Sequence, residues 1–219
     1  MKFIPIIPAV GSAVMGSLLG FNVMAHALWL ESDNAGARLY FGEYAENLRE
    51  TSPGRLDGII DPVIMLIDTN GKEKQAEAVL VDNHFTISRT GDSGTAVLAQ
   101  SLRQSIREPQ GEVPSPVYRR YLYARLGKGG SLPLDIQDDG NLLRLTFMGN
   151  PVSNVEVIVI APSGWEKHLR TDEKGEITFP GLEPGLHVIE AKYELNKPGE
   201  FEGKAYVVES HKTTLTLYR

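Results

Sequence analysis

The sequence predicts an all-β protein of two β-sandwich domains that follow an export signal. Two observations carry this prediction. After residue 25, short apolar runs alternate with turn signals along nearly the whole chain, and only one segment has a helical pattern. The 219 residues also include no cysteine, which excludes disulfides, thiolate metal sites and cysteine catalysis. The fold must therefore rest on its hydrophobic core.

Residues 1–25 have the composition of a cleaved signal peptide, with Lys2 as their one charge before a long apolar run. The small residues before and at Ala25 fit a cleavage site, and a cut there makes His26 the first residue. A cut after Ala27 fits the same rule and would discard the histidine. An uncleaved anchor is a third alternative, since the apolar run is about long enough to cross a bilayer. We expect cleavage after Ala25 and a periplasmic location.

The predicted N-terminal domain covers residues 26–132. Its strand candidates are 28–31, 37–41, 62–68, 76–81, 84–89 and 96–99. Asp82 and Asn83 are turn residues, so the runs on either side of them are predicted to form a hairpin. The polar, proline-rich residues 103–116 are predicted to be a loop.

Residues 117–126 are predicted to form the one helix of the chain, which ends at Gly127. Tyrosine and valine favour sheets, however, so a strand is the alternative for the same segment.

The predicted C-terminal domain covers residues 133–219, with a boundary near 130–135. Its seven strand candidates are 141–148, 155–160, 166–170, 176–179, 186–193, 203–208 and 213–217. Glycine, proline and asparagine turns separate them, including one at 196–199. Short alternating strands at this spacing are typical of a β-sandwich.

Several functions are excluded by what the sequence lacks. The net charge of −6 and the absence of a basic stripe exclude nucleic acid as an expected partner. There is no Gly-x-Ser-x-Gly elbow and no His-Glu-x-x-His motif, so a serine hydrolase and a zinc peptidase are not predicted. We expect a protein without enzymatic activity.

An N-terminal His26 would offer two nitrogen donors, its α-amine and its imidazole, which can chelate one transition metal ion. Nickel and copper(II) favour several nitrogen donors in tetragonal geometry. The α-amine must lose a proton to bind, so affinity should fall with pH. If the cut falls elsewhere, His26 is an ordinary residue near a strand start.

At least one more ligand must come from another part of the fold. His211 is the first candidate, and its alternative is a half-buried histidine bonded to the backbone. His84, beside Asp82, is the second, and its alternative is an exposed turn residue. His187 reads better as a core residue and His168 as part of a solvated strand.

Two resemblances extend this interpretation. Asn150 to Val155, the turn Thr171-Asp172-Glu173-Lys174-Gly175 and the segment 182–188 resemble a transthyretin-like or carboxypeptidase-regulatory-like sandwich. Together with the export signal, the start His26-x-x-Trp29 and the closing segment 210–216, the chain resembles the periplasmic DUF4198 family. That resemblance implies a metal-binding role associated with nickel or cobalt uptake.

We therefore predict a periplasmic protein that binds nickel, cobalt or copper through His26, His211 and His84. It would capture the ion or deliver it to a membrane transporter. One alternative is a metal-free module that binds an envelope protein. Another is an oxidase with a copper histidine brace, formed by an N-terminal histidine and a second histidine.

Overall fold

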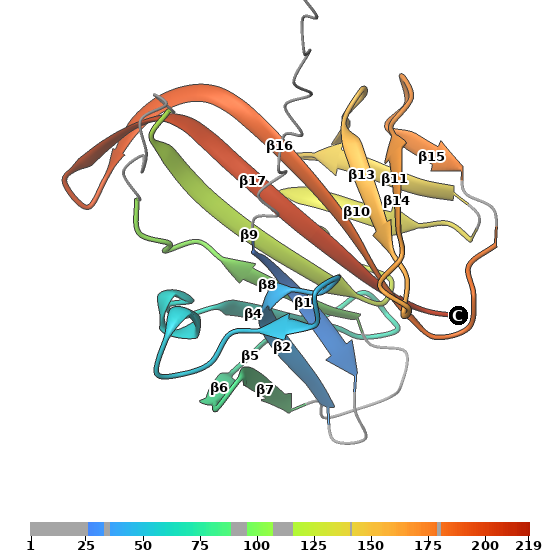
Figure 1. Cartoon of the computed structure of the whole chain (residues 1–219), viewed down its shortest axis with the longest axis horizontal. Helices are drawn as coiled ribbons and strands as arrows, with labels where there is room; N and C mark the ends of the chain where they lie inside the picture. The colour runs from blue at the N-terminus through green and yellow to red at the C-terminus, as the bar shows by residue number, and fades with distance from the viewer. Residues whose placement is uncertain (1–25, 33–35, 89–95, 107–115, 141, 179–180) are drawn as a thin grey trace, which may run out of the picture.

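The computed structural model describes residues 26–32, 36–88, 96–106, 116–140, 142–178 and 181–219. The described residues form three β-sheets, and their only helix is the short 3₁₀ turn η1 (Arg55–Gly58). The all-β prediction is confirmed (Figure 1). In this part of the chain no helix is long and apolar enough to cross a membrane.

The largest sheet has eight strands and runs through the centre of the molecule (Figure 1). Its strand order is β14 (Glu166–Arg170), β13 (Glu156–Ile160), β16 (Leu186–Phe201), β17 (Lys204–Tyr218), β9 (Tyr118–Leu126), β8 (Ala96–Ser101), β4 (Val63–Ile67) and β5 (Glu73–Ala76). The pairing of β17 with β9 is parallel, and the other neighbours are antiparallel. This parallel pair joins strands from the two predicted domains.

Two smaller sheets cover opposite faces of the central sheet. The N-terminal sheet contains β1 (Ala27–Ser32), β2 (Gly36–Glu43), β7 (His84–Ser88) and β6 (Ala78–Val81), with β3 (Leu48–Arg49) paired to β2. The C-terminal sheet contains β10 (Leu134–Asp138), β11 (Leu142–Phe147), β12 (Asn150–Pro151) and β15 (Glu176–Thr178).

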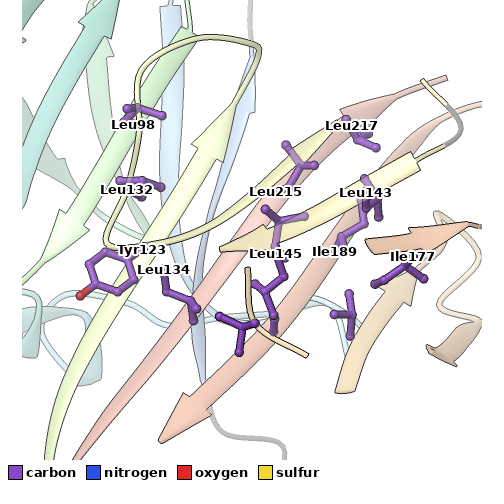
Figure 2. Close-up of a cluster of buried hydrophobic side chains, with 14 of the residues drawn as sticks. Leu98, Tyr123, Leu132, Leu134, Leu143, Leu145, Ile177, Ile189, Leu215 and Leu217 are labelled. Atoms are coloured by element: carbon purple, nitrogen blue, oxygen red, sulfur yellow. The ribbon is translucent and has the colours of Figure 1, made fainter. Parts of the chain in front are cut away.

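Alternation along the central strands separates the two hydrophobic cores. In β9, Leu122 and Ala124 pack toward the N-terminal sheet, whereas Tyr123 packs toward the C-terminal sheet. The C-terminal core also contains Leu98 of β8 (Figure 2). Leu132, at the predicted domain boundary, is itself buried there. The two sandwiches therefore share one central sheet, which contains strands from both 26–132 and 133–219.

A buried ion pair fixes this junction. The guanidinium of Arg125 donates from Nε and Nη2 to the two carboxylate oxygens of Asp135, both at 2.7 Å. It also donates to the carbonyls of Gly129 (2.7 Å) and Gly130 (3.0 Å). Arg125 and Asp135 are 2% and 1% exposed, so the pair is shielded from water.

The predicted helix at 117–126 is wrong, because this segment is the nine-residue strand β9. Its alternative, a strand, is the observed state. The segment lies between β17 and β8 in the sheet, and each neighbour supplies backbone partners along most of its length. Tertiary pairing thus decided between two local preferences.

The predicted separation of strands 203–208 and 213–217 is also wrong, because β17 is continuous. The turn predicted at 196–199 is a β-bulge within β16. The chain reverses instead at Glu202 and Gly203, whose φ angles are 51° and 75°. By contrast, the hairpin predicted around Asp82 and Asn83 is confirmed as β6 and β7.

Candidate metal site at His26

His26 lies immediately before β1, whose position is fixed on both sides. Leu28 and Leu30 are fully buried in the N-terminal core. The Thr214 hydroxyl of β17 donates to the Leu28 carbonyl at 2.7 Å. The Tyr218 hydroxyl accepts from the Ser32 amide at 3.0 Å. The start of β1 therefore runs beside the end of the chain, as a site shared between the two ends would require.

Each ring nitrogen of His26 faces a carboxylate. Nδ1 lies 3.0 Å from Oε1 of Glu43, and Nε2 contacts Oε1 of Glu50. The ring also lies against Phe41, with centroids 5.2 Å apart. The histidine side chain is 17% exposed, so it is held in place but open to a small ion.

The carboxylates reach the histidine because β2 turns back sharply into β3. Gly42 has a φ of 152°, and a Cβ at this position would lie 2.1 Å from the Leu48 carbonyl oxygen. Only glycine permits this close approach. The amide of Glu50 then donates to the Phe41 carbonyl at 2.9 Å, which brings the Glu50 side chain to the His26 ring.

Arg55 on η1 completes the group. Its Nη1 lies 3.5 Å from Oε1 of Glu50 and 3.2 Å from Nε2 of His26. Nε2 also contacts the Glu50 carboxylate. We therefore place a hydrogen on Nε2, donated to Glu50, and treat Arg55 as the ion partner of that carboxylate. Arg55 is mostly exposed, and it contacts the ring at Nε2, on the edge away from Nδ1.

The Nδ1 edge of the ring offers a nitrogen and a carboxylate oxygen, and both are donor types that transition metals take. Two ligands that each lie about 2.1 Å from a metal, at right angles, are about 3.0 Å apart. The Nδ1 to Glu43 distance of 3.0 Å meets this condition. A ligating histidine also commonly donates its other N–H to a carboxylate, which is the position of Glu50.

Side chains alone do not complete such a site. Among the described residues, no group of three or more His, Cys, Asp or Glu side chains is placed to hold a metal ion. Glu43 and Glu50 lie on opposite edges of the ring, so the three side chains do not converge on one point. A chain that begins at His26 would offer its α-amine as a further donor beside Nδ1.

The structure does not bring His211 to His26. The His211 ring stacks on Tyr121, with centroids 4.7 Å apart, and meets Phe147 of β11 edge-on. It therefore faces the C-terminal sheet. Thr214, three residues later, points to β1 on the other face of the central sheet. His26 and His211 lie on opposite faces, so they cannot ligate one ion.

His211 is a buried histidine with its own polar partners. Its Nδ1 lies 2.9 Å from the Tyr123 hydroxyl, and burial lowers its pKa. Its buried Nε2 is 3.7 Å from Oε2 of Glu209, too far for a hydrogen bond. The same carboxylate oxygen lies 3.1 Å from the Lys197 ammonium, which would oppose a metal ion there.

His84 lies at the start of β7, and its ring nitrogens contact Asn83 Oδ1 at 2.9 Å and Thr86 Oγ1 at 3.3 Å. The two carboxylates that contact His26 come from β2 and from the segment after β3. His187 is buried, as predicted, and burial lowers its pKa. His168 is on the exposed strand β14, near Glu156 and Glu166, also as predicted.

Sequence reasoning missed Glu43 and Glu50, which lie in a charge-rich segment without a recognisable metal-ligand motif. A local signal that could have found them is Gly42. It precedes a turn, and its strand pairs with β1, next to His26. Trp29 is fully buried, and its indole N–H donates to Glu31 at 2.9 Å.

Comparison with known proteins gives no match. No family model matches the chain, and no curated protein or solved structure is significantly similar to it. The candidate site must therefore be judged on its own geometry.

Proposed function

We propose that the exported chain begins at His26 and binds a divalent transition metal through this residue. The ligands are the α-amine and Nδ1 of His26 and a carboxylate oxygen of Glu43. The observation that supports this most is the pair of carboxylates around the ring, one at ligand spacing from Nδ1 and one on Nε2. The role is capture of the ion in the periplasm, or its delivery to an uptake system.

This proposal narrows the ligand set predicted from the sequence. His211 faces the opposite side of the central sheet, and His84 has other partners. A copper histidine brace between His26 and His211 is not proposed for the same reason. The site has two nitrogen donors and one oxygen donor from a single short region, and water would fill the remaining positions.

The chemistry of these donors favours copper(II) and nickel over zinc and cobalt. Two nitrogens and a carboxylate suit tetragonal coordination, and copper(II) binds most strongly in the general order of divalent ions. Nδ1 and the α-amine must both be free of protons to bind, so affinity falls as pH falls. Glu50, with Arg55 beside it, orients the ring and keeps the Nε2 hydrogen in place.

The decisive experiment compares two forms of the protein that differ only at the first amine. Both begin at His26, and in the second form the α-amine is acetylated and so becomes an amide. Calorimetric titration with copper(II), nickel, cobalt and zinc is expected to show one tight site in the first protein. The second should bind at least about 100-fold more weakly, because the chelate ring is lost.

Two histidine variants provide a matched control. His26→Ala should abolish binding. His168→Ala should leave it unchanged, although His168 also lies between two glutamates, at 3.4 Å and 3.3 Å. Equal affinity of the free and acetylated forms, or loss of binding in His168→Ala, would contradict the proposal. A melting temperature unchanged by all four metals would favour the metal-free alternative.

A further inference from the structure

Strand β6 presents an open, apolar sheet edge. It is the last strand of the N-terminal sheet, and in the described part of the chain its one strand partner is β7. Val79, Leu80 and Val81 are 54%, 40% and 44% exposed. The Ser52 amide donates to the Asp82 carbonyl at 2.7 Å, so the loop that contains Ser52 contacts the turn just after β6.

Both edges of the central sheet, by contrast, contain charged residues. The central sheet ends at β5, which contains Glu73 and Lys74, and at β14, which contains Lys167 and Arg170. Charged residues in edge strands are a common means of preventing the addition of another strand. The four residues of β6 are Ala-Val-Leu-Val and lack this protection.

We propose that β6 binds an extended segment of a partner protein, which adds to the N-terminal sheet as a further strand. Leu80 is paired with Phe85, a buried residue of the N-terminal core. A strand added beside β6 would therefore extend that core over Leu80. It would also cover Val79 and Val81 on the other face of the sheet. Backbone hydrogen bonds would supply affinity, and alternating apolar side chains would supply specificity.

The charges at the ends of β6 indicate the chemistry of the partner. Glu77 precedes the strand and Asp82 follows it, and neither forms an ion pair in the described part of the chain. A segment with lysine or arginine at both ends would match them. A second copy of this chain would not, because its own β6 would bring a further Glu77 and Asp82 to these ends. Like charges close together on neighbouring strands destabilise a sheet.

The test uses two labelled synthetic peptides in which valine alternates with threonine, one with lysines at both ends and one with glutamates. Fluorescence anisotropy with the folded, full-length protein is expected to show at least about tenfold tighter binding of the lysine-ended peptide. The double variant Val79→Lys, Val81→Lys should lose this binding. Val207→Lys, at a 47% exposed position on β17, should retain it.

Charge reversal gives a second, independent readout. In the variant Glu77→Lys, Asp82→Lys the preference should change to the glutamate-ended peptide, with an unchanged melting temperature as the check on folding. Three results would overturn the proposal: no binding of either peptide, equal binding of both, or dimerisation of the protein through β6. The last result, seen by light scattering and removed by Val79→Lys, would identify a second copy as the occupant.

Discussion

Replacement of Asp135 by asparagine tests how the two sandwiches are joined. Asp135 accepts both bonds of the Arg125 guanidinium at 2.7 Å, and it also accepts from the Leu132 amide (3.3 Å) and from Gln137 (3.1 Å). Asparagine has nearly the same shape. It removes the negative charge and turns an NH₂ group toward one guanidinium nitrogen.

The expected cost follows from burial. Arg125 is 2% exposed, so the substitution leaves a positive charge in the interior without its counter-charge. Breaking a buried pair in this way costs about 3–5 kcal/mol in the free energy of unfolding. At about 3 °C per kcal/mol for a chain of this size, the melting temperature should fall by about 12 °C.

Urea unfolding followed by circular dichroism measures this loss. The control is the double variant Arg125→Met, Asp135→Leu, which removes both charges. It should be more stable than Asp135→Asn, although the carbonyls of Gly129 and Gly130 lose a donor. A loss below about 1 kcal/mol in Asp135→Asn, or a double variant that is the less stable of the two, would refute this reasoning.

Two further predictions concern pH and cooperativity. Burial lowers the pKa of His211 in the folded protein, so the unfolded chain binds the proton first as pH falls below about 6.5. The free energy of unfolding should be highest above that pH, and this group should lower it by at most about 1.4 kcal/mol for each pH unit below. The variant His211→Gln should show a shallower decline. An unchanged slope in urea titrations at pH 5 to 7 would contradict it. Because the two sandwiches share one sheet, they should unfold together. Trp→Phe variants that keep only the buried Trp29 or only the 61% exposed Trp165 should therefore have the same unfolding midpoint. Separate midpoints would show that the halves unfold independently.

Local signals in the sequence were sufficient where the structure is local. Asp82 and Asn83 predicted the hairpin of β6 and β7. The interpretations of His187 as a core residue and of His168 as part of a solvated strand are confirmed. The same reasoning failed at 117–126, where tyrosines and arginines suit either a helix or a strand. It also failed at 196–199, where turn residues form a bulge because β17 continues to pair on both sides of them.

The sequence by itself determined that this protein is all-β, because alternation and turn residues act over a few neighbouring positions. It also determined which histidines exist to bind a metal. Only the tertiary structure decided which side chains lie close to each histidine. Opposite faces of one sheet separate His26 from His211, and the return of the chain at Gly42 brings Glu43 and Glu50 to His26. Such proximity depends on the pairing and layering of strands distant in the chain, which no local pattern specifies.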